Sequence, residues 1–332
     1  MFKKYFFLLT VLLLVSCNSG LDQQKIEAEI NKLEKISEET NSKFFEIRTL
    51  IEDLADSIQI LYENQNQILP NIDKSKYKTA SNGVFYKTKD DGGSAVYVST
   101  IRPLTKSIKD IVYFTEPIEN EMKKIMETKS EIAQIYYNDN HDYNRIYPFF
   151  DVLSVYEPNL DISSFNFYYL ADETHNPSRK SLWVADPYVD PAGRGWMVSS
   201  IAPVYFKNQL VGVPGIDITI NTLIEKYLMD DNILILDNKG VVVAAHENLI
   251  KLLSFPQLKD HKYIETIKLE TFRKDLYNIL KSKSKEIRNI GERIFSGSEK
   301  YFNINLNDKN YYFFISDVEE VNWKIVKVLA VK

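Results

Sequence analysis

Asp217 is the residue most obviously placed to do chemistry, because it interrupts an apolar, β-branched run at residues 211–220 (VGVPGIDITI). A carboxylate between Ile216 and Ile218 is costly to bury unless something pairs with it. We therefore expect a cationic partner close to Asp217, supplied either by the protein or by a bound molecule.

The stretch around Asp217, residues 165–220, is rich in aromatic side chains and holds two of the three tryptophans. Prolines next to asparagine or aspartate predict turns at 176–177 and at 190–193. Two β-branched runs, 197–205 and 211–220, predict a hairpin joined by residues 206–210. This composition suits one wall of a binding pocket.

Other arrangements of chemically competent residues lack usable spacing. The Gly-Val-Pro-Gly segment at 212–215 is not a phosphate-binding glycine pattern, and there is no Gly-x-Ser-x-Gly element or nucleophilic cysteine. The histidines stand far apart, with no second ligand at zinc spacing: His141, His175, His246 and His261. We expect a protein that is not an enzyme and that uses no cofactor or metal.

The first seventeen residues have the features of an export signal. Lys3 and Lys4 precede an apolar run at 6–15 that is too short to span a bilayer, and residues 14–17 (LVSC) resemble the lipobox of bacterial lipoproteins. Cleavage before Cys17 would leave an acylated N-terminal cysteine and so an extracytoplasmic, lipid-anchored protein, on the periplasmic or the surface side. The alternative is an ordinary cleaved signal with a chance cysteine.

Composition limits the partners. Cys17 is the only cysteine, so the protein must be held by its core and not by disulfides. Loss of residues 1–16 would leave 39 basic against 46 acidic side chains. An acidic balance argues against nucleic acid as a partner.

Residues 21–68 contain no proline or glycine, which favours one long helix that ends before Pro70, within a segment 18–69. Ser37 and Thr40 are polar interruptions in an otherwise apolar stripe. The stripe follows steps of three and four: Ile26, Ile30, Leu33, Phe44, Ile47, Ile51, Leu54, Ile58 and Leu61. Such a stripe forms a coiled-coil homodimer seam, the contact of a helix with its own domains, or both.

The remaining chain alternates strand and helix signals. Expected elements before residue 230 are strands on either side of an Asp-Asp-Gly-Gly turn in 83–100, a helix at 117–129, a hairpin in 130–148 that turns at 138–142, and a helix at 221–228. Beyond a boundary at Asp230-Asp231 we expect a hairpin over 233–245, a helix at 272–285, and strands at 301–306, 310–317 and 323–331. The fold class is therefore α+β, with two antiparallel sheets in series.

This order of elements resembles the extracytoplasmic double Cache family, which has a long N-terminal helix followed by two PAS-like domains. The resemblance rests on IYYNDNHDYNRIYP, FYYLA with NP and DPYVD, PVYFKNQLVGVPGIDITI, ILILDNKGVVVAAH and NWKIVKVLAVK. It implies a membrane-distal, ligand-binding domain at 70–229 and a membrane-proximal domain at 230–332.

The amino-acid-binding branch of that family implies a site. An Arg-x-Trp-Tyr element there grips the ligand carboxylate, and a later tyrosine and aspartate hold its ammonium. The matching positions are residues 165–168 (FNFY), then Tyr188 and Asp217. Phe165 stands in place of the arginine and cannot make its bidentate bonds to a carboxylate.

The positions that survive favour a cationic or amino-acid-like ligand. Asp217 would supply charge, and rings would supply cation–π contacts from Phe167, Tyr168 and Tyr188, with Phe165 as a specificity determinant. A carboxylate anchor from a nearby loop is the other option, from Arg179, Lys180 or Arg194.

Two functions follow from the resemblance. Receptors of this family continue into a membrane helix and an output module, whereas nothing follows Lys332 here, so a sensor or solute-binding protein would need a membrane receptor or transporter as partner. The alternative is an envelope interaction or adhesion protein that has kept the scaffold and lost the ligand.

Overall fold

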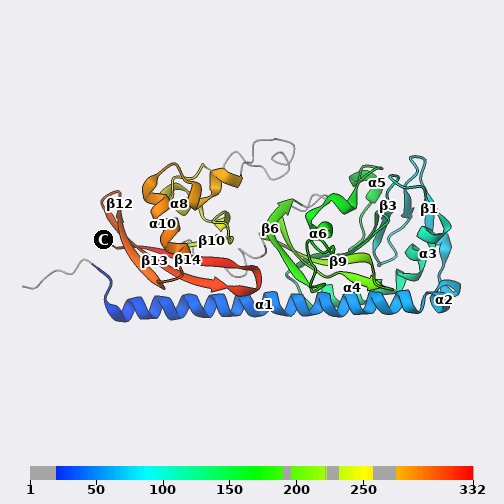
Figure 1. The fold of residues 1–332 in the computed structure, drawn as a ribbon, viewed down its shortest axis with the longest axis horizontal. Coiled ribbons are helices and arrows are strands. Elements are labelled where there is room, and N and C mark those ends of the chain that lie inside the picture. Colours follow the sequence, from blue (N-terminus) through cyan, green and yellow to red (C-terminus); the bar gives the residue numbers. More distant parts are fainter. Residues whose placement is uncertain (1–19, 190–195, 221, 223–231, 257–273, 332) are drawn as a thin grey trace, which may run out of the picture.

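Two antiparallel sheets lie side by side along one long helix in the computed structural model, which describes residues 20–189, 196–220, 222, 232–256 and 274–331 (Figure 1). The first sheet has nine strands and the second has five. The predicted α+β class, with a long N-terminal helix and two sheets in series, is confirmed.

Helix α1 spans Gln23–Glu63, and the Asp22 side chain caps it by accepting a hydrogen bond from the Lys25 amide. The chain then continues through α2 (Gln65–Ile68) into a 3₁₀ turn, η1 (Leu69–Asn71), that contains Pro70. Ser37 belongs to the buried face, where its hydroxyl lies 2.5 Å from that of Ser316. The polar interruptions therefore continue the buried stripe instead of breaking it.

The apolar stripe of α1 packs against the chain's own domains. Phe44 sits at the middle, with its ring edge-on to Trp183 of the first domain at 4.7 Å and to Trp323 of the second at 5.5 Å. Tyr62, near the end of the helix, packs edge-on against Phe114. Of the two interpretations of the stripe, contact with the helix's own domains is the one observed. The buried residues of the stripe therefore pack inside the chain.

The nine-stranded sheet has the order β1-β2-β3-β5-β4-β9-β7-β6, with β8 paired to β9. Its strands are β1 (Tyr77–Thr79), β2 (Phe85–Lys87), β3 (Ala95–Val98), β4 (Ile132–Asp139), β5 (Tyr143–Tyr147), β6 (Leu182–Val189), β7 (Trp196–Ile201), β8 (Val204–Phe206) and β9 (Gln209–Thr219). The strands predicted in 83–100 and the hairpin in 130–148 are confirmed.

Helices cover both faces of this sheet (Figure 1). The face that meets α1 also carries η3 (Glu116–Ile118), α3 (Lys106–Phe114) and α4 (Glu119–Thr128), the last close to the predicted helix at 117–129. The opposite face carries α5 (Val152–Val155), η4 (Ile162–Ser164) and α6 (Asn166–Tyr169). Successive residues of a strand point to opposite faces. Ile135 and Tyr137 of β4 therefore enter the core shared with α1, whereas Tyr136 points to the other face.

The hairpin predicted at 197–220 differs in detail. Its first strand breaks at Ala202-Pro203 into β7 and β8, and both β7 and β8 pair with β9. The turn is only Lys207-Asn208, and both residues have positive φ. Such two-residue turns match the twist of paired strands. The expected connection at 206–210 was therefore too long.

The second sheet has the order β11-β10-β14-β13-β12. Its strands are β10 (Ile233–Leu236), β11 (Val242–Ala245), β12 (Tyr301–Leu306), β13 (Lys309–Val318) and β14 (Trp323–Val331). Three further short segments lie in the described part of the chain: η2 (Lys74–Lys76), which precedes β1, α8 (Glu247–Leu252), which follows β11, and η8 (Glu319–Val321), which precedes β14. The hairpin over 233–245 and the three C-terminal strands are confirmed.

The helix predicted at 272–285 is wrong over its described part. Residues 274–281 form two 3₁₀ turns, η6 (Lys274–Tyr277) and η7 (Ile279–Lys281), and α10 (Lys285–Phe295) begins where the prediction ended. Asn278 between them has an extended backbone, and its side chain accepts a hydrogen bond from the Leu280 amide. This local bond competes with helix formation. The predicted helix at 221–228, apart from Thr222, and the boundary at 230–231 lie outside the described residues.

Candidate ligand-binding site

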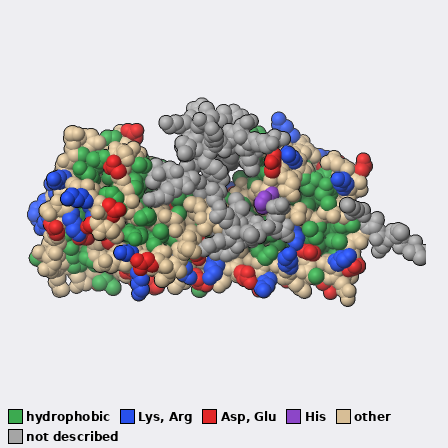
Figure 2. All heavy atoms as spheres, turned by 180° about the vertical axis from the view of Figure 1, so that it is seen from behind, with side chains coloured by type: hydrophobic (Ala, Val, Ile, Leu, Met, Phe, Trp, Pro, Cys, Tyr) green, Lys and Arg blue, Asp and Glu red, His purple; other side chains and the backbone are tan. Residues whose placement is uncertain are grey.

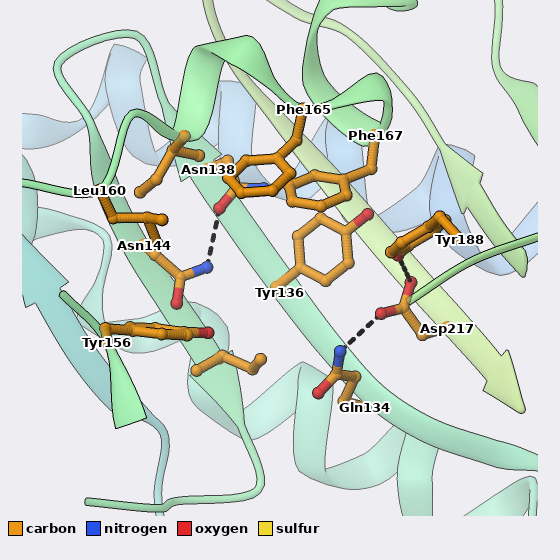
Figure 3. A pocket seen from close by; sticks show the side chains of 12 residues that line it. Gln134, Tyr136, Asn138, Asn144, Tyr156, Leu160, Phe165, Phe167, Tyr188 and Asp217 are labelled. Carbon is orange, nitrogen blue, oxygen red and sulfur yellow. Dashed lines mark hydrogen bonds between the residues drawn. The ribbon is translucent and has the colours of Figure 1, made fainter. Parts of the chain in front are cut away.

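A pocket lies on the face of the nine-stranded sheet that is turned away from α1 (Figure 3). Its lining residues are Gln134, Tyr136, Asn138, Asn144, Ile146, Tyr156, Leu160, Ile162, Phe165, Phe167, Tyr188 and Asp217. The empty space between the lining atoms, including the part that is open to solvent, is about 390 Å³. The space that a water molecule can occupy is only about 30 Å³. The smaller figure limits a ligand, because it leaves room for only a few water molecules. A metabolite would have to displace part of the lining.

The floor of the pocket is built from cross-strand pairs. Gln134 of β4 lies opposite Asp217 of β9, and Asn138 of β4 lies opposite Asn144 of β5. Tyr136 lies between these two pairs, on the same face of β4. Successive side chains of a strand point to opposite faces, so every second residue lies on the same face. β4 therefore supplies Gln134, Tyr136 and Asn138 to the floor at regular spacing.

Gly215 makes room for the tyrosine of the floor. It is the β9 partner of Tyr136, and a Cβ atom at this position would stand 2.1 Å from Cζ of the Tyr136 ring. Any side chain at residue 215 would therefore push the ring out of the floor. The last glycine of the Gly-Val-Pro-Gly segment is therefore needed for the packing of the Tyr136 ring.

Asp217 forms one end of the pocket, with only 1% of the residue exposed. Its carboxylate accepts hydrogen bonds from Gln134 Nε2 at 2.6 Å, from the Ser199 hydroxyl at 2.5 Å and from the Tyr188 hydroxyl at 3.2 Å. Hydrogen bonds to a charged group contribute about 1.5–3 kcal/mol each, which offsets the cost of burying the carboxylate. These three donors are neutral.

The roof of the pocket is aromatic. Phe165 and Phe167 stack with ring centroids 5.0 Å apart and planes only 7° from parallel. Phe167 also contacts the ring of Tyr188, at 5.3 Å, and that of Tyr136, at 5.6 Å. The roof therefore joins the acidic end of the pocket to its floor (Figure 3).

Four of the five predicted ligand-binding residues line this pocket: Phe165, Phe167, Tyr188 and Asp217. Tyr168 is buried but is not a lining residue. Burial raises the pKa of the Tyr168 hydroxyl well above its ordinary value, and the carboxylates of Asp139 and Asp142 raise it further. Tyr168 therefore faces the charged β4–β5 turn.

The alternative carboxylate anchors do not reach the pocket in the described part of the chain. Arg179 is exposed, donates hydrogen bonds to Asn208 and Glu173, and lies over the ring of Tyr205. Lys180 is also exposed, and neither residue lines the pocket. Arg194 and the lipidation residue Cys17 lie outside the described residues.

Sequence reasoning missed eight of the lining residues: Gln134, Tyr136, Asn138, Asn144, Ile146, Tyr156, Leu160 and Ile162. The signal for the β4 residues was the alternation in IAQIYYND, in which every second residue, Gln134, Tyr136 and Asn138, is polar or carries a hydroxyl. In a buried strand, such a polar face points toward a ligand or toward water.

The β4–β5 turn beside the site carries a histidine–carboxylate pair. Asp139 accepts hydrogen bonds from the backbone amide of His141 at 2.7 Å and from Tyr62 of α1 at 3.1 Å, and lies 2.8 Å from His141 Nδ1. The hydrogen bond to Asp139 raises the pKa of His141 above its ordinary value, against burial and the charge of Arg102.

The His141–Asp139 pair should make the stability of the turn depend on pH. A raised pKa in the folded state means that the pair stabilises fully below the unfolded-state value of about 6.5 and loses this contribution as the pH rises through the folded-state value. We expect His141→Gln to lower the free energy of unfolding by less than about 1 kcal/mol at about pH 5.5, since the side chain is partly exposed, and by almost nothing at about pH 9. Urea denaturation at both pH values measures this, and an equal loss at both would contradict it.

Comparison with known proteins gives structural matches alone. No protein-family model matches the sequence, and no curated protein matches it significantly. Among solved structures, the extracellular domain of a predicted histidine kinase, mmHK1S-Z3, aligns with a TM-score of 0.54 and 12% identity, covering 93% of this chain and 95% of that domain. The fold is a double Cache fold.

Two chemoreceptor domains also share this double Cache fold. The ligand-binding domain of PctB from Pseudomonas aeruginosa PAO1, in complex with L-Arg, aligns with a TM-score of 0.51 and 10% identity over 93% of this chain and 96% of that one. The ligand-binding domain of CtaA from Pseudomonas fluorescens, in complex with L-leucine, aligns at 0.52 and 14% identity over the same shares. Matches at this identity establish the fold and leave the ligand of this chain open.

The described surface carries charged side chains of both signs. Basic and acidic side chains are interspersed over the described part of the face seen in Figure 2. Within the described ranges, no helix combines the length and the apolar character needed to span a bilayer.

Proposed function

We propose that this protein is an extracytoplasmic, lipid-anchored sensor or solute-binding protein, and that its nine-stranded domain binds a small cationic or zwitterionic metabolite. The observation that carries this proposal is the joint position of Asp217, Tyr188 and the stacked Phe165–Phe167 pair around one pocket. A buried carboxylate next to aromatic rings favours an ammonium group, by ionic and cation–π attraction.

The described lining supports an amine over a carboxylate. It includes one acidic residue and no lysine or arginine, and Phe165 occupies the position at which the amino-acid-binding branch carries its arginine. Anchoring through Cys17 and the action on a membrane receptor or transporter complete the proposal. They rest on the lipobox-like LVSC segment and on the shared fold with sensor domains.

A thermal-shift screen of the full chain tests the ligand class. The panel comprises polyamines, quaternary amines, amino acids, purines and short carboxylates. A ligand present at a hundred times its dissociation constant adds about 2.7 kcal/mol to the free energy of unfolding, which raises the melting temperature by a few degrees. We expect shifts from compounds that carry an ammonium group. Shifts from carboxylates alone, or no shift across the panel, would contradict the proposal.

A further inference from the structure

The end of the pocket away from Asp217 contains two buried amide side chains whose hydrogen-bonding capacity is only partly used. Asn144 Nδ2 donates to Asn138 Oδ1 at 2.7 Å (Figure 3). Asn138 is 1% exposed and Asn144 is 6% exposed. Asn138 Nδ2 and Asn144 Oδ1 have no hydrogen-bond partner in the described part of the chain. One buried donor and one buried acceptor therefore belong to the same pocket wall.

This result does not depend on how the amide groups are oriented. Oxygen and nitrogen of an asparagine side chain are assigned from the hydrogen-bond network, so both groups could be turned over together. Asn138 Nδ2 would then donate to Asn144 Oδ1, which would leave Asn138 Oδ1 and Asn144 Nδ2 unused. In either arrangement the pair presents one donor and one acceptor.

The unused donor and acceptor of the asparagine pair can bind a ligand group that offers an acceptor to the donor and a donor to the acceptor. A neutral primary carboxamide or a urea does so, with its carbonyl accepting and an N–H on the same side donating. A carboxylate would place a lone pair against the asparagine oxygen, and an alkyl group would leave both buried polar atoms unsatisfied, at about 1–3 kcal/mol each.

The two polar ends of the pocket lie at a distance that a short molecule can span. Gln134, the partner of Asp217, and Asn138 are four residues apart on β4, which corresponds to about 13 Å at the rise of a strand. Hydrogen bonds of roughly 2.9 Å at each end leave about 7 Å between the ammonium and the amide of the ligand. A chain of about five methylene groups covers this distance.

We infer that the ligand of this pocket carries a neutral amide or urea-like group about 7 Å from its ammonium, and that Asn138 and Asn144 bind this group. The inference rests on the proposed function, since Asp217 must hold the ammonium. Phe165, Phe167 and Tyr136 cover the apolar chain between the two ends. Because the free pocket admits only a few waters, the roof moves outward when this molecule binds.

Three matched amines test the inference by titration calorimetry on the full chain: 6-aminohexanamide, 6-aminohexanoate and hexylamine. They share the ammonium and an apolar chain, and differ in the group at the far end. We expect 6-aminohexanamide to bind the wild type at least about tenfold more tightly than the other two, because only it pairs both asparagines. Equal affinities for all three would overturn the inference while the amine site stands. Absence of binding by all three would overturn the amine site and the inference with it.

The double variant Asn138→Leu, Asn144→Leu separates recognition from folding. Replacing both partners by apolar groups of similar shape is close to neutral for stability, so the melting temperature should stay the same or rise. The tenfold preference for the amide over hexylamine should disappear, because the apolar wall no longer offers the amide its two hydrogen bonds. Asn140→Leu is the matched control, because Asn140 lies in the same hairpin and also has an unsatisfied buried oxygen but does not line the pocket. A preference that persists in the double variant, or one that is lost in Asn140→Leu, would overturn the assignment to the pair.

Discussion

Asp217→Asn should weaken the binding of every ammonium ligand by at least about thirtyfold, while the protein remains folded. The variant keeps the shape of the side chain but removes the charge that faces the pocket. Losing one partner of a buried, hydrogen-bonded charge pair costs about 2–5 kcal/mol, which is a loss of roughly thirtyfold to several thousandfold in affinity. Titration calorimetry with the best amine of the screen measures the affinity, and thermal unfolding confirms the fold.

Asp186→Asn is the matched control for this experiment. Asp186 lies on β6, two residues before Tyr188, and its carboxylate pairs with Lys239 at 2.6 Å. It does not line the pocket. The control removes the same charge from the same domain and should leave the affinity unchanged. An unchanged affinity in Asp217→Asn would remove Asp217 from the site.

Arg145→Met should produce the largest loss of stability, about 3–5 kcal/mol, because it breaks a buried ionic network by removing one partner. The Arg145 side chain is 0% exposed and pairs with Glu119. Its guanidinium also donates to the Tyr143 hydroxyl at 2.7 Å and to the Val112 carbonyl at 2.7 Å. Methionine fills part of the space but leaves these acceptors without their donor. Urea denaturation measures the free energy of unfolding.

Arg102→Met provides the comparison for that measurement. Arg102 also pairs with a buried carboxylate, that of Asp142, at 3.0 Å, but its side chain is 52% exposed. Water screens and replaces an exposed pair, so we expect a loss below about 1 kcal/mol. If both variants lost the same free energy, burial of Arg145 would not be what makes its network important.

The fold could be predicted from the sequence where a pattern of apolar residues extends over a whole helix or strand. Helix α1 was predictable because a long segment without proline or glycine repeats one apolar spacing, and strands such as β10 and β14 because they are continuous apolar runs. The prediction of a helix at 272–285 failed because the Asn278 side chain accepts a hydrogen bond from the Leu280 amide, and this local bond interrupts the helix. The spacing of apolar residues along the sequence does not reveal a single competing hydrogen bond of this kind.

The site was predictable where it depended on one stretch of chain and not where it depended on pairing between strands. Asp217 stood out because its neighbours are apolar, whereas Asn138 and Asn144 gain meaning only from the register that places them opposite each other. Tyr168 lies beside Phe167 in sequence, but consecutive residues of a helix point about 100° apart, so only Phe167 enters the pocket.

Gly93 is subject to two constraints, one from the turn in which it lies and one from the side chains packed against it. The sequence marks it as part of a turn, yet a Cβ atom there would overlap the carboxylate of Glu119 at 1.9 Å and approach Lys87 Nζ at 2.8 Å. The glycine is required because the buried charges around Arg145 and Glu119 lie directly against the backbone. Only the folded structure reveals this second constraint.

Helix α1 also determines how the protein can be divided in the laboratory. Its N-terminal half closes the core of the five-stranded sheet, its C-terminal half closes that of the nine-stranded sheet, and Phe44 belongs to both. Excising residues 22–64 would strip both sheets at once, so such a truncation would report on unfolding and not on dimerisation. A chimaera that exchanges either domain must therefore also exchange the matching half of the helix.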